Sequence, residues 1–264
     1  MIGDDMNENA PPSKGKVFVE AFARGLRVIE AFGSDARRLS VAQVAKRADI
    51  DRAVARRLLY TLLELGYLKT DGKQFELTPL VLRLGFSFIS SVDLGGRIQP
   101  YLDQLSQRVQ ESVSVTVLMG TEITYVARSD GAARPVNFVA LTGSSLPVSA
   151  TSSGRLLLST LPDEEVEKVL REAPIVKYTP STVLDRNELL KIVQQSRIDG
   201  WAVVEEELEI GLVSGSVLLR SRSGVDVAAL NVSSHRSRSD RRRMVEDLIP
   251  QLRQTADSLQ ELLL

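Results

Sequence analysis

Residues 39–66 are the stretch that most constrains the fold of this chain. They contain two short helical patterns, residues 41–48 and 52–65, with only three residues between them. Helix, tight turn and helix is the order of elements in a helix-turn-helix, whose second helix enters the major groove of DNA. The stretch therefore predicts this arrangement.

The second helical pattern predicts two contrasting faces. At about 100° per residue, its apolar side chains fall within an arc of about 80°. These side chains are Val54, Leu58, Leu62 and Leu65. Arg52 and Arg56 lie on the opposite side, and Arg57 flanks them. Arginines on a helix are usually only solvated charges, so this face alone does not separate a DNA contact from an ordinary surface.

The residues that follow favour DNA binding. Residues 66–69 end the helix and begin an extended run, and residues 74–77 return with alternating polarity. Between them, Asp71 and Gly72 tolerate the positive φ angles that tight hairpin turns need. A two-stranded ribbon directly after such a helix is a wing, and Leu39 is expected to pair briefly with it. Helix-turn-helix plus wing is more specific than either part.

Three sequence runs in this region carry a family resemblance. Residues 22–32 (FARGLRVIEAF), 39–45 (LSVAQVA) and 62–68 (LLELGYL) together resemble the N-terminal domain of IclR-type bacterial transcriptional regulators. Residues 51–57 (DRAVARR) are similar to the Pca/Pob-type subgroup, which controls aromatic-acid breakdown through β-ketoadipate. The resemblance covers nearly all of the chain from residue 18 onward and is strongest in the first third.

Length and composition fit a two-domain protein. With 264 residues, each of two domains can bury its own core. No apolar run is long enough to cross a bilayer, and residues 1–16 have no apolar signal core. The absence of cysteine excludes disulfides, thiolate metal sites and cysteine nucleophiles. These features predict a cytoplasmic location without a membrane partner.

The distribution of charge is more informative than its total. The net charge is −1, which would not suggest a nucleic-acid binder. Residues 13–90, however, carry 14 lysines and arginines against 8 aspartates and glutamates, whereas residues 91–264 carry 19 against 23. A basic first third on a slightly acidic remainder predicts DNA binding confined to one domain.

We expect four segments along the chain. Residues 1–15 are predicted to be a disordered tail, residues 16–78 a winged helix-turn-helix domain, residues 79–95 a linker helix, and residues 96–264 an effector-binding and oligomerisation domain. The linker is unusually apolar for a connector. This favours packing on a second subunit, with packing inside the domain as the alternative.

The last segment mixes helical and strand patterns. The helical ones are residues 97–111, 153–160, 163–172, 185–200 and 241–264, the last with a kink expected at Pro250. The strand patterns are residues 113–119, 123–128, 136–141, 201–206, 216–220 and 225–233. This order predicts an α+β domain with an antiparallel sheet, and the family resemblance implies that the domain is GAF-like.

Catalysis is not indicated. The single histidine, His235, lies among serines and arginines, and no base with a partner carboxylate is visible near a candidate serine. No nucleotide-binding fingerprint occurs, so no cofactor is expected. The carboxylates of residues 205–207 and 209 could suggest a metal ion. Because adjacent side chains on a strand point to alternate faces, most of these carboxylates are expected to be solvated instead.

Residues 141–155 form a polar segment that runs into a helix. Five serines and two threonines offer hydroxyls, and the helix start offers unpaired N–H groups and a positive dipole end, which can hold a small anion. A plain loop with serine helix caps is the alternative. The family resemblance implies that an effector is held here. The candidate contacts are Leu146, Ser152, Ser153, Gly154 and Arg155.

The resemblance also implies that two later strands face the effector. They would contribute Ser214, Asn231 and Ser233. Asn231 and Ser233 share one strand face because they are two residues apart. The residues after Ser214 depart from the family pattern, which leaves the register there open. Arg134 is an additional candidate partner for a carboxylate, or an ordinary surface charge.

The sequence therefore predicts a DNA-binding transcriptional regulator controlled by a small organic acid. The candidates for reading bases are Arg52, Ala53, Arg56 and Arg57. The candidates for phosphate contacts are Ser40, Gln43, Lys69 and Lys73. Ser40 and Gln43 also fit a capping box at the start of the first helix.

The resemblance implies a homodimer or homotetramer on a palindromic operator, and an aromatic acid or a β-ketoadipate-like dicarboxylate as effector. Two other classes of protein stay open. One is a ligand-independent DNA-binding protein, and the other is an enzyme that acts on a small carboxylic acid.

Overall fold

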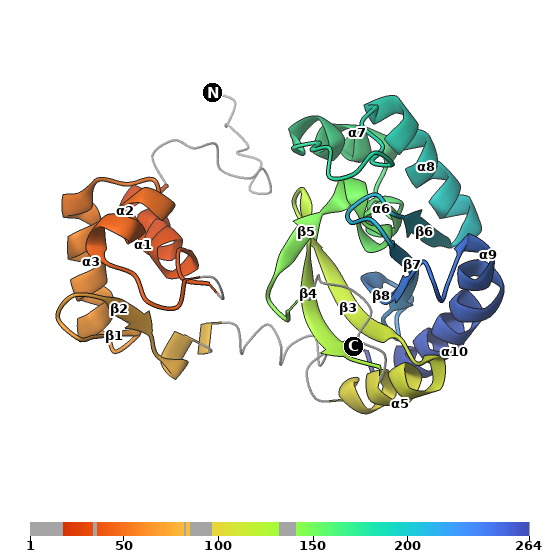
Figure 1. The fold of residues 1–264 in the computed structure, drawn as a ribbon, viewed down its shortest axis with the longest axis horizontal. Helices are drawn as coiled ribbons and strands as arrows, with labels where there is room; N and C mark the ends of the chain where they lie inside the picture. Colours follow the sequence, from red (N-terminus) through yellow and green to blue (C-terminus); the bar gives the residue numbers. More distant parts are fainter. Residues whose placement is uncertain (1–17, 34–35, 82, 85–96, 132–140, 264) are drawn as a thin grey trace, which may run out of the picture. The chain divides into compact units, whose positions relative to one another are not determined.

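The computed structural model describes residues 18–33, 36–81, 83–84, 97–131 and 141–263 (Figure 1). The chain divides into two compact units, Met1–Phe86 and Ser87–Leu264. The predicted tail and most of the predicted linker helix lie outside the described residues; the linker's first residues, Pro79–Val81, form a short 3₁₀ helix. No described helix is long and apolar enough to cross a membrane.

The first unit is a winged helix-turn-helix, as predicted. Its elements are α1 (Glu20–Glu30), α2 (Val41–Arg47), α3 (Arg52–Glu64), β1 (Leu68–Thr70) and β2 (Phe75–Leu77). The two strands pair antiparallel (Figure 1). Leu39 forms an isolated bridge with Phe75 of β2, which confirms the expected contact between the start of α2 and the wing.

Local chemistry explains where α2 starts and stops. The Ser40 hydroxyl accepts from the Gln43 amide, and the Gln43 side chain accepts from the Ser40 amide, so the predicted capping box is present. Asp49 has a φ of 49°, a left-handed conformation that Asp tolerates better than most residues. This single residue gives the sharp turn between α2 and α3.

The buried face of α3 differs from the predicted one. The side chains that enter the core are Ala55, Leu59 and Leu62, with exposures of 0%, 0% and 9%. Of the predicted set, only Leu62 is buried, whereas Leu65 is 59% exposed. The buried face is therefore rotated towards Ala55 and Leu59, which share one core with residues of α1 and α2, while Leu58 is only partly buried against that core. The arginines are exposed, as expected.

The second unit is built on one six-stranded antiparallel sheet of order β5-β4-β3-β8-β7-β6. The strands are β3 (Ser112–Met119), β4 (Glu122–Ser129), β5 (Ser145–Pro147), β6 (Trp201–Glu205), β7 (Leu212–Arg220) and β8 (Asp226–His235). The α+β prediction is confirmed. The edge strand β5, however, lies inside residues 141–155, which were predicted to be a polar loop. Of the strand predicted at residues 136–141, residues 136–140 lie outside the described residues.

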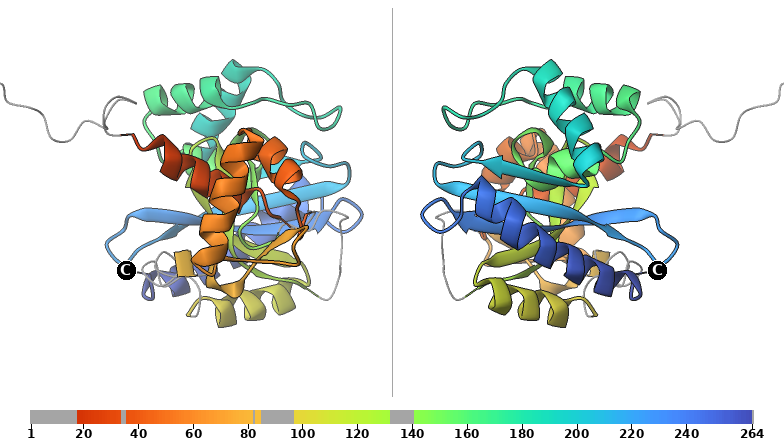
Figure 2. Two further views of the ribbon diagram at one scale, coloured as in Figure 1. Left: turned by 90° about the vertical axis from the view of Figure 1, so that its left-hand side faces the viewer. Right: turned by 90° about the vertical axis from the view of Figure 1, so that its right-hand side faces the viewer.

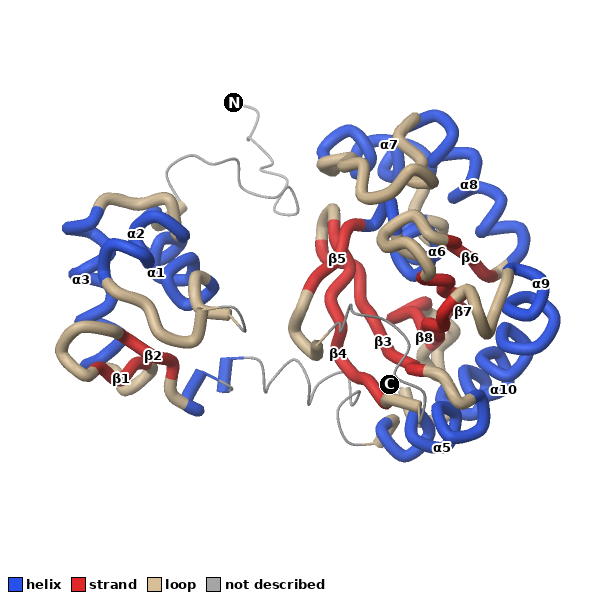
Figure 3. Tube along the Cα trace, viewed as in Figure 1, coloured by secondary structure: helices blue, strands red, loops and turns tan. Residues whose placement is uncertain are grey.

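Helices cover both faces of this sheet (Figures 2 and 3). One face packs on α5 (Gln99–Val109) and α10 (Ile249–Gln260), and the other on α6 (Ser152–Leu158), α7 (Asp163–Glu172) and α8 (Arg186–Asp199). Strand alternation separates the two cores. Val113, Val115 and Val117 of β3 face α5 and α10, so the intervening residues of β3 face α6.

The last helical stretch is irregular just before its proline. Residues Arg241–Arg243 form α9, a π-helical turn follows at Met244–Leu248, and α10 begins at Ile249. Proline cannot donate an amide hydrogen bond, so the ladder must be interrupted near Pro250. The chain makes this adjustment with one wide turn rather than by ending the helix.

Candidate functional site

The outer face of α3 carries one well-positioned cation. The Arg56 guanidinium lies over the ring of Tyr60, 5.6 Å from its centroid. Tyr60 in turn meets Phe75 of the wing edge-on, with centroids 5.8 Å apart and planes at 82°. This stack restricts the Arg56 rotamers on the wing side of the helix. Tyr60, half exposed, was not among the predicted site residues.

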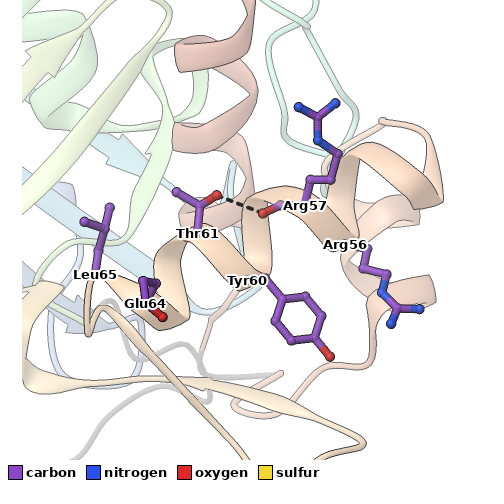
Figure 4. A pocket seen from close by; sticks show the side chains of 6 residues that line it. All are labelled: Arg56, Arg57, Tyr60, Thr61, Glu64 and Leu65. Carbon is purple, nitrogen blue, oxygen red and sulfur yellow. Dashed lines mark hydrogen bonds between the residues drawn. The ribbon is translucent and has the colours of Figure 1, made fainter.

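The other predicted base-reading residues are also exposed on α3. Figure 4 shows Arg57 and Thr61 on one side of the helix and Arg56 and Tyr60 on the other. Arg52 and Ala53 occupy the first turn and are exposed. The two neighbouring arginines therefore point in different directions, about 100° apart.

Three cations converge on one carboxylate at the base of the wing. Glu76, with a side chain only 8% exposed, accepts from Arg37 at 2.6 Å and from Arg38 at 3.2 Å, and lies 3.4 Å from Lys69. The Arg37 hydrogen bond, with Arg38 and Lys69 acting in the same direction, holds the pKa of Glu76 below its usual range. Arg37 and Arg38 extend the basic surface beyond the predicted residues.

The predicted phosphate contacts lie on two other elements of the unit, the start of α2 and the wing. Ser40 and Gln43 lie at the start of α2 and bind each other, while their positions remain partly or fully exposed. Lys73 is exposed in the β1–β2 turn, where its amide donates to the Asp71 carboxylate. The first unit thus presents α3, the start of α2 and the wing as one candidate DNA-binding surface.

The second unit has a polar patch on the sheet face that packs on α6. Strand register places Ser114 opposite Asn231 and Asn231 opposite Ser216. In the next row, Ser112 is opposite Ser233, which is opposite Ser214. Six short polar side chains thus share one sheet face, which is unusual for a buried surface. We call these six residues the polar rows.

Residues of α6 bind directly to the polar rows. The Ser152 hydroxyl lies 3.1 Å from that of Ser214 and 2.8 Å from that of Ser216. The Ser153 hydroxyl lies 3.0 Å from Ser216. The Asn231 amide donates to the Ser152 hydroxyl at 3.0 Å. The structure therefore brings together five predicted residues: Ser152, Ser153, Ser214, Asn231 and Ser233.

Two other predicted residues have structural partners instead. Arg155 is 3% exposed and forms a bidentate pair with Glu207 at 2.7 and 2.6 Å, and its Nε donates to the Ser149 carbonyl. Glu207 is thus buried and paired, whereas most carboxylates of this acidic cluster were expected to be solvated. A Cβ atom on Gly154 would lie 2.4 Å from the Cα of Val148. Glycine is therefore required for close packing of the backbone.

The remaining candidates lie at the edges. Leu146 of β5 pairs with Ile123 and packs on the core beneath α6 and α7. Arg134 lies outside the described residues. Arg128 of β4, which was not predicted, is opposite Ser114 and contacts the Ser112 hydroxyl at 3.4 Å and Asp130 at 2.7 Å. Its side chain is 18% exposed, so it places a positive charge beside the polar rows.

The structure adds little to support catalysis. His235 accepts from the Ser237 amide and lies against Gly211. Its ring forms a hydrogen bond with the Ser237 hydroxyl and, among the residues that the structure describes, with no carboxylate. Within the described residues, no group of three or more histidine, aspartate or glutamate side chains is arranged to hold a metal ion.

A winged helix-turn-helix in one unit and an α+β fold with a buried polar face in the other are typical of two-domain transcriptional regulators. Residues 21–72 match the model of the IclR helix-turn-helix domain, and residues 86–261 match the model described as bacterial transcriptional regulator IclR C-terminal. The chain belongs to the IclR family of bacterial transcriptional regulators.

Three known proteins illustrate the similarity. The Pca regulon regulatory protein of Pseudomonas putida is 40% identical over 233 residues, 88% of this chain and 80% of that protein. The p-hydroxybenzoate hydroxylase transcriptional activator of Acinetobacter baylyi is 36% identical over 249 residues, 93% of this chain and 92% of that protein. A double mutant of the PobR inducer-binding domain from Acinetobacter, solved with 3-hydroxybenzoic acid, has a TM-score of 0.60 at 29% identity and covers 63% of this chain and 97% of that one.

Proposed function

We propose that this chain is a sequence-specific transcriptional regulator whose DNA binding is controlled by a hydroxylated aromatic acid. The first unit contacts an operator, and the second binds the acid between α6 and the sheet. The observation that carries the proposal is the register that places Ser214, Asn231 and Ser233 around Ser152. The named inducer complex and the Pca relative support an aromatic acid over other small anions.

In the proposed DNA complex, Arg56 reads a base edge. Its stack on Tyr60 reduces the rotamer entropy that is lost when a long side chain becomes ordered. Arg52, Ala53 and Arg57 reach bases or phosphates from the same helix. Ser40, Gln43, Lys69 and Lys73 bind phosphates, which position the protein without reading sequence.

The Arg56→Ala variant tests this assignment. Losing an arginine–guanine pair costs about 1–3 kcal/mol, so operator affinity should fall by about tenfold or more. The measurement is a gel-shift titration at fixed salt with DNA upstream of the chain's own gene. Arg171→Ala, on an exposed arginine of α7, is the control and should leave the midpoint unchanged. Equal midpoints for wild type and Arg56→Ala would contradict the placement of α3.

In the proposed effector complex, the polar rows and Ser152 and Ser153 bind the carboxylate. Arg128 supplies the positive charge, because its guanidinium already lies beside Ser112. Arg155 and Gly154 act indirectly, by fixing the start of α6 against the preceding turn. Effector binding can switch DNA binding only if one arrangement of the oligomer binds the acid more tightly than another. The proposal contains no catalytic step.

Calorimetry on the full chain tests the sensor assignment. We expect heat of binding with 4-hydroxybenzoate or protocatechuate, and a loss of affinity of about tenfold in Asn231→Ala. The matched control is Asn187→Ala, an exposed asparagine of α8. Absence of heat with both acids and with β-ketoadipate would favour a ligand-independent DNA-binding protein.

We further propose that the chain works in the cytoplasm as a homodimer or homotetramer on a palindromic operator, with the apolar linker of residues 79–95 packed on a second subunit. Closed symmetric oligomers place two identical DNA-binding surfaces on symmetric half-sites. Sedimentation with and without operator DNA tests this part. A monomer in both samples would contradict it.

A further inference from the structure

Beside the polar rows, one buried hydroxyl is left without a partner. Thr116 of β3 is 0% exposed, and its Oγ1 atom has no hydrogen-bond partner among the described residues. Buried hydroxyls are nearly always paired, because an unpaired one loses its bonds to water without compensation. The site therefore lacks a polar group that would bind Thr116.

Register fixes what surrounds this hydroxyl. Thr116 lies directly opposite Tyr125 of β4 on one side and Ala229 of β8 on the other. Tyr125 and Ala229 both belong to the core between the sheet and α6–α8. Directly opposed residues present their side chains on the same sheet face, so Thr116 also points towards α6. On that side, Ala229 presents only a methyl group, which cannot form a hydrogen bond with the Thr116 hydroxyl.

The backbone is irregular at this position. The β3–β4 register shifts between Val115 and Thr116. Such bulges redirect a side chain and are frequent beside binding sites. Here the bulge brings Tyr125, rather than its neighbour, opposite Thr116. The result is a pair of hydroxyl-bearing side chains, from two strands, at the same level of the sheet.

Tyr125 is suited to donate a hydrogen bond. Its side chain is only 7% exposed, and burial raises the pKa of its hydroxyl to about 12 although Arg128 acts in the opposite direction. The phenol therefore remains protonated at neutral pH. No hydrogen bond contributes to the pKa shift of this hydroxyl. Thr116 can accept or donate, and Tyr125 can donate, so together they suit a ligand group that both accepts and donates.

We propose that Thr116 and Tyr125 bind the ring hydroxyl of the aromatic acid effector and so distinguish hydroxybenzoates from unsubstituted benzoate. The inference rests on the proposed sensor function and assigns it a specificity determinant. Thr116 is two residues beyond Ser114, about 7 Å along the strand. This spacing fits a benzoate ring whose carboxylate lies at the polar rows and whose hydroxyl points to Thr116.

The test uses the full chain, calorimetry, and three probes: 4-hydroxybenzoate, 3-hydroxybenzoate and benzoate. For the wild type, the better hydroxybenzoate should bind about tenfold or more tightly than benzoate. Thr116→Val keeps the shape and removes the hydroxyl, so it should lose that preference while benzoate affinity stays the same. Tyr125→Phe should reduce the preference in the same way. Thr116→Ser keeps a hydroxyl at this position and should keep the preference, and Tyr125→Phe remains an independent test if the valine variant fails to fold.

Ser106→Ala is the matched control. Ser106 of α5 carries the other buried hydroxyl that has no partner within the described residues, but α5 packs on the opposite face of the sheet. This variant should leave the preference unchanged. Neither hydroxyl has a hydrogen-bond partner among the described residues, so Thr116→Val and Ser106→Ala should both keep or raise the melting temperature without ligand.

The outcomes separate this inference from the proposed function. If the wild type binds benzoate and both hydroxybenzoates equally, or if Thr116→Val weakens all three acids by the same factor, the inference is wrong and the sensor function stands. If the wild type gives no heat of binding with these three acids, with protocatechuate or with β-ketoadipate, the sensor function fails and the inference fails with it.

Discussion

Glu76 is the residue on which three cations of the first unit converge, and it yields a pH prediction. Its pKa is lowered from the ordinary 4.5, chiefly by the Arg37 hydrogen bond. A carboxylate with a depressed folded-state pKa contributes stability above its unfolded pKa, and this contribution is lost as pH falls through the folded value. Glu76→Gln should therefore destabilise the wing at pH 7, and the difference from wild type should shrink as pH falls below about 4.5.

Amide hydrogen exchange of the β1–β2 ribbon in the full chain measures this effect. The control is Glu64→Gln, an exposed carboxylate near the end of α3. Faster exchange in Glu76→Gln at pH 7, but not in the control, is the expected result. A difference that grows towards acid pH would contradict the sign of the linkage.

The residue scale also shows which contacts the sequence can reveal. The Ser40–Gln43 capping box was predictable because its partners are three residues apart and the geometry is local. The Arg155–Glu207 pair joins residues 52 positions apart, and no local pattern indicates it. The sequence alone therefore assigned Arg155 to the effector, although a buried carboxylate already holds it. Thr116 could not be found either, because its importance lies in a missing partner.

At the scale of elements, the junction between the turn at residues 148–150 and α6 depends on one glycine. A Cβ atom on Gly154 would lie 2.4 Å from the Cα and 2.5 Å from the carbonyl oxygen of Val148. Backbone atoms cannot move aside as a flexible side chain can. Gly154→Ala should therefore destabilise the second unit by about 1–3 kcal/mol, and it should weaken effector binding because α6 carries Ser152 and Ser153.

Thermal unfolding and calorimetry of the full chain measure these two effects. Gly25→Ala provides the comparison, because its Cβ would meet only the Leu58 side chain at 3.9 Å. In the interior of α1, that change should be neutral or stabilising by roughly 0.5–1 kcal/mol. If the Gly154 variant melted and bound like wild type, the close approach of Gly154 to the Val148 backbone would be absent in solution.

Elements with strong local signals were predicted well. The bounds of α7 are those expected, and α8 begins after the predicted cap at Asp185 and ends at Gly200, whose φ is 69°. Elements fixed by distant partners were not. The edge strand β5 exists only because β4 offers it hydrogen-bonding groups, and the buried face of α3 is set by the helices around it. Propensity could not supply either.

At the scale of the whole molecule, charge is segregated along the sequence rather than averaged. Most basic residues of the winged helix-turn-helix are exposed, including Arg37 and Arg38, which share the single carboxylate of Glu76. In the second unit, by contrast, Arg155 is buried against Glu207. The net charge of −1 thus conceals a basic surface that can release counterions from DNA. This division was predictable from counts of charged residues, since it needs no knowledge of contacts.

The segregation predicts a salt dependence that belongs to one unit. For double-stranded DNA, each phosphate contact contributes about −0.9 to the slope of log affinity against log salt concentration. The double variant Lys69→Gln, Lys73→Gln should therefore make the slope less steep by about two, and weaken binding to specific and non-specific DNA alike.

The matched double variant Lys168→Gln, Lys191→Gln makes the same charge change at exposed positions of α7 and α8. Long-range attraction by net charge would change both slopes equally at low salt, whereas direct phosphate contact changes only the first. Fluorescence anisotropy distinguishes these alternatives when it is measured between about 50 and 200 mM salt, the range over which phosphate contacts weaken strongly. Equal slopes in the two variants would place the DNA-binding surface elsewhere than the wing.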